Sequence, residues 1–164
     1  MKLKKIYTVI AVILLIGIYL MIFKLSAEDA QQSSKVSQAV TAFVKNLYDA
    51  LFSSTGGTTQ GNASGNTFPL EAFLRKLAHF TEYFCVGFLS YSIVKLWVSN
   101  LRKGTGLVML QLLLSASLDE FHQYFVPGRN ASIRDVCIDC MGGILGMILI
   151  GLIFHRYRAI KGYR

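Results

Sequence analysis

Long apolar runs alternate with shorter polar segments along this chain. Four runs approach or reach the length of about 20 residues that a helix needs to cross a bilayer: 6–23, 77–98, 107–125 and 136–154. The first run has no charged residue and the others have few. Because only helices and closed barrels satisfy their backbone hydrogen bonds in lipid, the pattern predicts an all-α membrane protein with four transmembrane helices. These helices fit a single domain, residues 1–164.

The segment 24–76, between the first two runs, is predicted to lie outside the cell membrane. Within about 34–52, apolar positions such as Val36, Val40, Leu47 and Leu51 recur at helical spacing. This predicts an extracellular amphipathic helix between transmembrane helices 1 and 2. Residues 53–67 are rich in Gly, Ser, Thr and Asn, which predicts a flexible tether. The amphipathic helix either moves over the bundle on this tether or packs against it as a strut.

The charges divide by side of the membrane. A formal net charge of +8 would suit nucleic-acid binding, but the basic residues lie beside the apolar runs as the positive-inside rule requires. With both termini cytoplasmic, the inner segments, including the basic tail 155–164, hold no acid, and all 9 Asp and Glu residues fall on the outer side or in outer halves of spans. We therefore predict a multi-pass membrane protein with both termini cytoplasmic and no nucleic-acid partner. A cleaved signal over 1–27 is the alternative, disfavoured by the long apolar run and by Lys24.

Three of the predicted spans carry acids at a similar depth. Glu82, Asp119 and Asp139 lie about 7–10 Å from the outer ends of their spans at a rise of about 1.5 Å per residue. An acid near the centre of a span disfavours insertion by roughly 2.5–3.5 kcal/mol, and such residues normally face a bundle interior or a wet cavity. The second, third and fourth spans are therefore predicted to share one polar pocket that opens outward.

Helical spacing indicates which polar side chains face this pocket together. They form three stripes, one on each span: Arg75, His79 and Glu82; Ser115, Asp119 and Gln123; Asp135 and Asp139. Asp119 and Glu120 are adjacent and point about 100° apart, so we expect one to be a ligand group and the other a brace. Gly142, Gly143 and Gly146 would let a neighbouring backbone approach the fourth span closely.

Basic residues gather at the expected rim of the pocket, namely Arg75, Lys76, Arg129 and Arg134. Two interpretations stay open. These residues either neutralise the acids in a salt-bridge network that fixes helix packing, or they capture a phosphate from the outer leaflet.

Metal binding is the weaker interpretation of the same polar residues. His79 and Glu82 on one span, with Asp119 and His122 on the next, offer nitrogen and oxygen atoms that suit a metal ion. No established metal-binding spacing is present. We therefore predict no metal site and no cofactor.

Three motifs follow one another in the second half of the chain: RKLAHFTEY at 75–83, DEFHQYFVPGR at 119–129 and RDVCIDCMGGILG at 134–146. In this order they resemble the VanZ-like family of bacterial membrane proteins, over residues 75–154. The resemblance marks Lys76, His79, Glu82, Tyr83, Asp119, Glu120, Gln123, Pro127, Arg129, Asp135 and Gly142. Asp139 departs from the asparagine expected at its position, and an ionised acid accepts hydrogen bonds but cannot donate them. The resemblance implies a Gram-positive cell membrane and a link to resistance against teicoplanin, a glycopeptide that acts on cell-wall precursors; it implies no established reaction.

Three functions stay open on the sequence. The favoured one is a pocket that binds or modifies a cell-envelope lipid or cell-wall precursor, such as a polyprenyl-phosphate intermediate, and so lowers teicoplanin susceptibility. Its predicted ligand-binding residues are Arg75, Lys76, His79, Glu82, Tyr83, Asp119, Glu120, Gln123, Arg129, Arg134, Asp135 and Asp139. The second is an intramembrane acid/base enzyme acting on a lipid or peptide, with catalytic candidates Glu120, Asp119, Glu82, His79 and His122. The third is a non-catalytic accessory protein whose polar network is structural. The sequence gives no indication of the oligomeric state.

Overall fold

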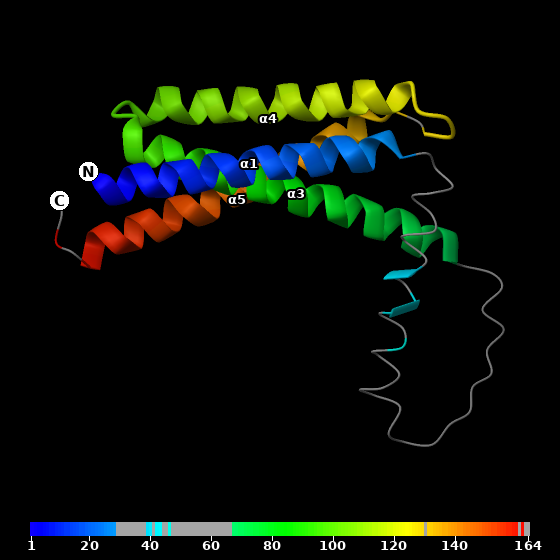
Figure 1. Ribbon diagram of the computed structural model, residues 1–164, viewed down its shortest axis with the longest axis horizontal. Helices are drawn as coiled ribbons and strands as arrows, with labels where there is room; N and C mark the ends of the chain where they lie inside the picture. The colour runs from blue at the N-terminus through cyan, green and yellow to red at the C-terminus, as the bar shows by residue number, and fades with distance from the viewer. Residues whose placement is uncertain are drawn as a thin grey trace, which may run out of the picture.

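Four long helices make up most of the computed structural model, which describes residues 1–28, 39–40, 42–43, 46, 67–129, 131–160 and 162, with the side chains of 67–72 left aside. They are α1 (Lys2–Ala27), α3 (Thr67–Trp97), α4 (Leu101–Tyr124) and α5 (Ile133–Ile160). The helices run side by side in alternating directions, so the start of α1 and the end of α5 lie at the same end of the bundle (Figure 1). The predicted all-helical fold is confirmed.

Each of the four apolar runs lies almost entirely within one helix, but α3 and α4 begin well before the predicted spans 77–98 and 107–125. The predicted spans cover only the apolar residues that would lie within a bilayer. The helices are longer because their backbone hydrogen bonding continues through the polar residues on either side. The start of α4 is fixed by Asn100, whose side chain accepts a 3.2 Å hydrogen bond from the backbone N of Lys103. Such an N-cap satisfies one of the amide groups that a helix start leaves without a partner.

Two of these helices are long and apolar enough to cross a membrane by length and composition. Within the part of the chain that the structure describes, they are α1, with a mean hydropathy of 2.8, and α5, with 2.3. Helices α3 and α4 are continuous, but polar and charged residues near one end of each interrupt their apolar sequence. That all four helices span the membrane stays a prediction.

Large apolar side chains cover the outside of the bundle. Exposed examples are Ile6, Val9, Ile10 and Ile13 of α1, Leu110, Leu113, Leu114 and Leu118 of α4, and Leu145, Ile148, Leu149 and Leu152 of α5. Soluble monomers rarely expose contiguous apolar patches larger than a few hundred Å². This surface is therefore suited to lipid.

The interior of the bundle is formed by side chains from all four helices. Tyr83 and Val86 of α3 pack with Leu112 of α4, Met147 of α5 and Ile22 of α1. A polar bridge also crosses this interior, because Nε2 of Gln111 donates 3.0 Å hydrogen bonds to the hydroxyls of Tyr19 and Ser90.

Glycines bring the backbones of α3 and α5 into contact. A Cβ atom at Gly142 would lie 2.3 Å from the main-chain oxygen of Phe80, and one at Gly146 would lie 2.1 Å from that of Phe84. The close approach expected from the glycine spacing is therefore present. Asp139 lies one turn before Gly142 on α5, so this close approach also brings Asp139 near His79 of α3.

The predicted amphipathic helix 34–52 and tether 53–67 lie almost wholly outside the described residues. Of the former, residues 39–40, 42–43 and 46 are described, and they are helical.

Candidate functional site

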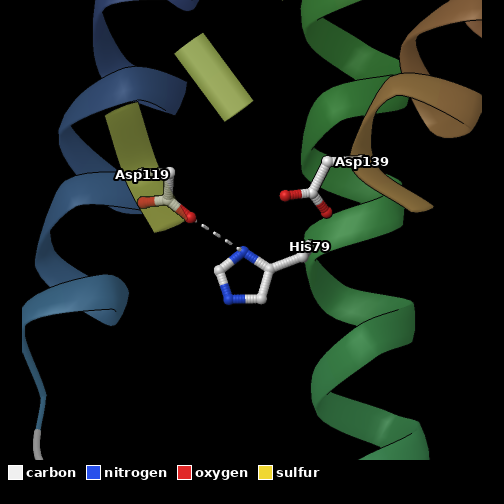
Figure 2. Close-up of side chains that lie close together, drawn as sticks. All are labelled: His79, Asp119 and Asp139. Carbon is white, nitrogen blue, oxygen red and sulfur yellow. Dashed lines mark ion pairs between the residues drawn. The ribbon is translucent and has the colours of Figure 1, made fainter. Parts of the chain in front are cut away.

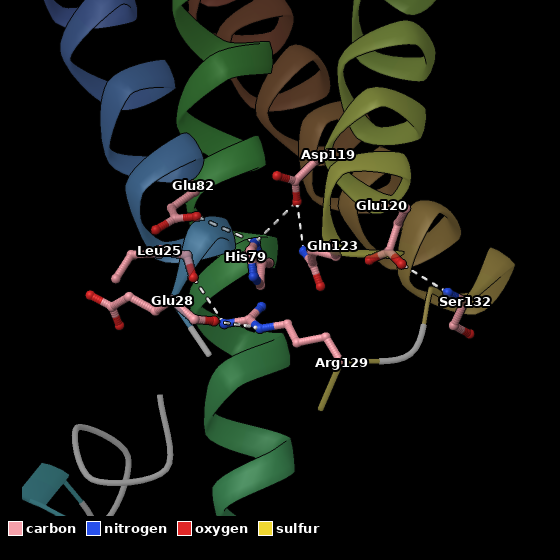
Figure 3. A network of polar contacts seen from close by, with 9 residues as sticks. All are labelled: Leu25, Glu28, His79, Glu82, Asp119, Glu120, Gln123, Arg129 and Ser132. Carbon is pink, nitrogen blue, oxygen red and sulfur yellow. Dashed lines mark hydrogen bonds and ion pairs between the residues drawn. The ribbon is translucent and has the colours of Figure 1, made fainter. Parts of the chain in front are cut away.

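The acids predicted to share a pocket meet at the end of the bundle where α1 and α4 finish and α3 and α5 start (Figures 1 and 3). Glu82, Asp119 and Asp139 are all buried, and Asp139 is only 2% exposed. Three helices thus place carboxylates at one level, as the depth estimate predicted.

His79 lies among these acids (Figure 2). Its Nδ1 atom is 3.5 Å from Oε2 of Glu82 and 3.9 Å from Oδ2 of Asp119. Asp139 approaches from α5, and one ring nitrogen of His79 and one oxygen from each aspartate all lie within 4.8 Å of one another. The arrangement joins α3, α4 and α5 through charged or chargeable groups at a single point.

The adjacent acids Asp119 and Glu120 have different surroundings (Figure 3). Oδ2 of Asp119 accepts a 3.0 Å hydrogen bond from Nε2 of Gln123, one turn later on α4. Oε2 of Glu120 accepts a 2.8 Å hydrogen bond from the backbone N of Ser132, just before α5. Asp119 therefore faces His79, whereas Glu120 contacts the start of α5 and also lines the polar cavity at this site.

Lys76 in the third turn of α3 and Asp135 in the first turn of α5 form an ion pair at the rim of the site. Their side chains are 43% and 29% exposed. A pair this exposed orients the two helices more than it stabilises the fold.

Arg129 attaches the loop after α4 to the end of α1. Its Nε atom donates a 3.1 Å hydrogen bond to the main-chain oxygen of Glu28, and Nη2 donates one of 2.9 Å to that of Leu25 (Figure 3). Burial lowers the pKa of the Arg129 guanidinium, and the nearby Arg75 lowers it further, although an arginine stays charged in a protein. Sequence reasoning missed these acceptors, because a main-chain oxygen carries no residue-type signal.

The other predicted rim arginines differ in their surroundings. Arg75 is half-buried, and its guanidinium makes no hydrogen bond or ion pair with any residue that the structure describes. Arg134 is exposed, and its side chain lines neither of the two cavities at this site. Arg75 is therefore the better placed of the two for an anionic ligand.

Two cavities open at this end of the bundle. The polar cavity has a volume of about 250 Å³ and is lined by Arg75, Lys76, His79, Glu120, Gln123, Gly128, Arg129, Asp135, Ile138 and Asp139. The apolar groove, of about 510 Å³, is lined by Ile18, Met21, Leu25, Glu28, Val40, Leu74, Arg75, Leu77, Ala78, His79, Thr81, Glu82, Cys85 and Arg129. Arg75, His79 and Arg129 line both, so the polar cavity and the apolar groove adjoin one another.

Four of the predicted site residues line neither cavity, namely Tyr83, Asp119, His122 and Arg134. Tyr83 is fully buried in the bundle interior. The ring of His122 stacks on Phe23 of α1 with the centroids 4.9 Å apart. The α1 wall of the groove, by contrast, was missed, because no sequence motif indicates which neighbour α1 packs against.

The sequence pattern of the family described as VanZ/LLP1 matches residues 11–154 of the chain. The resemblance found in the three motifs is thus confirmed, and it extends over α1. No curated protein and no solved structure matches the chain. The match and the two apolar helices α1 and α5 together indicate a membrane protein.

Proposed function

The chain belongs to the VanZ/LLP1 family, and from this premise and the geometry above we propose that it binds a phosphate-bearing lipid of the cell envelope. One observation carries the proposal. The polar cavity and the apolar groove share Arg75, His79 and Arg129, and a lipid is a ligand that needs a charged and an apolar compartment side by side.

In the proposed topology, the protein crosses the membrane four times and both termini lie in the cytoplasm. Lys2, Lys95, Lys103 and Arg156 belong to helix ends that lie at one end of the bundle (Figure 1). Asp119 and Glu120, near the end of α4, and Asp135, near the start of α5, belong to the opposite end. Cytoplasmic loops carry the excess of Lys and Arg, so the polar cavity faces outward. A C-terminal green fluorescent protein fusion is expected to fluoresce and a C-terminal alkaline phosphatase fusion to be inactive; active phosphatase there would contradict this topology.

The head group of the lipid is proposed to lie in the polar cavity. A guanidinium binds phosphate through paired hydrogen bonds in a fixed geometry, and Arg75 has no described hydrogen-bond or ion-pair partner that would compete. Arg129 lies beside it, held by α1. The two guanidinium groups give this end of the cavity a positive charge next to the carboxylates.

The hydrocarbon chain is proposed to lie in the apolar groove between α1 and α3, against Ile18, Met21, Leu74 and Leu77. Burial of apolar surface contributes about 25 cal/mol per Å², so a chain seated there adds affinity that a free phosphate lacks. A polyprenyl-phosphate cell-wall intermediate meets both requirements, and we propose this class of lipid as the ligand.

Native mass spectrometry of the gently extracted protein tests the proposal with matched variants. Arg75→Gln removes one of the two arginine charges that line both cavities, and Arg134→Gln removes an exposed charge that lines neither. The wild type and Arg134→Gln are expected to retain a phosphate-bearing lipid, and Arg75→Gln to lose it. Equal retention by all three proteins would overturn the proposal.

We further propose that binding of a cell-wall precursor lowers susceptibility to teicoplanin. Expression of the wild type in a Gram-positive host is expected to raise the inhibitory concentration of teicoplanin, and Arg75→Gln at equal abundance to abolish the rise. An inhibitory concentration that the wild type leaves unchanged would contradict this part alone, since lipid retention is measured separately.

A further inference from the structure

The acids around His79 make no direct ion pair with a lysine or arginine among the described residues. The charged contacts of Glu82 and Asp119 go to the same imidazole of His79. The guanidinium groups of Arg75 and Arg129 line the adjoining polar cavity but do not reach these acids at ion-pair distance. Buried charges are normally paired with opposite charges or coordinate metals. A cation bound among these acids would complete the pairing.

Several polar atoms of the cluster also lack hydrogen bonds. Nδ1 of His79 and Oε2 of Glu82 are buried and have no hydrogen-bond partner among the residues that the structure describes. Asp139, only 2% exposed, makes no hydrogen bond or ion pair within the described part of the chain, and it points towards His79 and Asp119 (Figure 2). In native structures, a group of this kind requires an explanation such as an ion or a water that binds it.

The geometry of the cluster fits an ion. The candidate atoms of His79, Asp119 and Asp139 lie within 4.8 Å of one another. Metal bonds to histidine nitrogen and carboxylate oxygen are about 2.0–2.2 Å long, so two ligands of a tetrahedral ion lie about 3.5 Å apart. Side-chain rotations that draw the three atoms about 1 Å closer together would complete the site.

We propose that His79, Asp119 and Asp139 bind a divalent transition-metal ion, Zn²⁺ or Mn²⁺. One imidazole with two carboxylates suits these ions, since imidazole favours zinc and carboxylate favours manganese. Gln123 holds Asp119 by the 3.0 Å hydrogen bond described above, which is the kind of second contact that orients a metal ligand. Glu82, 3.5 Å from Nδ1 of His79, supplies a further acid within reach.

The bound ion would border the polar cavity, because His79 and Asp139 both line it. Three protein ligands leave a coordination position open in the manner of zinc sites that bind water or substrate. The sequence argument against a metal site relied on ligand spacing within one helix. Here the three ligands come from α3, α4 and α5, a combination that no linear motif records.

The test measures metal directly and needs no lipid, so its failure is distinguishable from a failure of the lipid proposal. The tag-free protein in detergent is stripped with a chelator, dialysed against Zn²⁺ or Mn²⁺ at micromolar concentration, and analysed for metal by mass spectrometry. We expect about one ion per chain and a rise in thermal stability on binding, because a ligand of the folded state stabilises it.

The variants separate this site from incidental binding. Asp139→Asn and His79→Gln are expected to lose the ion, with affinity falling by more than the roughly 10–100-fold that hydrogen-bond partners of metal ligands contribute. His155→Ala, which removes an exposed histidine near the end of α5, is the control and is expected to keep it.

Folding of the variants is checked without metal. Asp139→Asn preserves shape and removes one buried charge, so the metal-free variant is expected to melt no lower than the metal-free wild type. A wild type that binds neither ion, or an Asp139→Asn variant that binds as the wild type does, would overturn the proposal and leave protonation as the means by which the cluster is neutralised.

Discussion

Arg129 and Leu25 are joined by a 2.9 Å hydrogen bond from Nη2 of the guanidinium to the main-chain oxygen. A helix leaves its last carbonyl groups without partners inside the helix. The loop between α4 and α5 therefore completes the end of α1, and it does so at the junction of the polar cavity and the apolar groove.

Replacement of Arg129 by alanine is expected to destabilise the protein. The substitution removes hydrogen bonds from a charged donor to Leu25 and Glu28, and bonds of this kind contribute about 1.5–3 kcal/mol each. Thermal unfolding of the detergent-solubilised protein measures the loss, and Arg134→Ala provides the control. An unchanged melting temperature in Arg129→Ala would show that the α1 end is held by other contacts. Arg75→Gln is for this reason the cleaner probe of lipid binding.

The contact between α3 and α5 is expected to tolerate no side chain at Gly146. A Cβ atom there would lie 2.1 Å from the main-chain oxygen of Phe84, whereas one at Gly151 on the same helix would lie 3.6 Å from the ring of Tyr91. Overpacking costs about 1–3 kcal/mol and occasionally more, so Gly146→Ala is expected to lower the yield and melting temperature of the folded protein. Gly151→Ala is expected to leave both unchanged or slightly raised. Similar behaviour of the two variants would contradict the packing described.

The ion pair of Lys76 and Asp135 is expected to add little to stability. Both side chains are partly exposed, at 43% and 29%, and exposed pairs measured in double-mutant cycles contribute about 0.2–1 kcal/mol. Lys76→Met, Asp135→Asn and the double variant together give the coupling free energy. A coupling free energy of several kcal/mol would contradict this prediction, because it would require the ion pair to be shielded from water.

Much of the site followed from the sequence because helical periodicity and depth are local properties. The acids Glu82, Asp119 and Asp139 could be placed at one level from residue counts alone, and the glycine spacing indicated the close approach of α5. Periodicity does not record which neighbour a helix packs against. The position of α1 beside α3, and with it the groove wall and the acceptor at Leu25, therefore needed the structure.

The surroundings of two predicted site residues did not follow from the sequence. The ring of His122 stacks on Phe23 of α1, and Arg134 is exposed and lines neither cavity. Separation along the chain does not record which neighbouring helix a side chain meets, so these contacts needed the structure.

Site-specific photocrosslinking tests lipid binding most directly. A photoreactive residue is placed at Ala78, which lines the apolar groove, and for comparison at Leu114, which lies exposed on α4 outside both cavities. Irradiation of intact cells is expected to attach one class of phosphate-bearing polyprenyl lipid at position 78 and the bulk membrane lipids at position 114. The same mixture of bulk lipids at both positions would contradict the account.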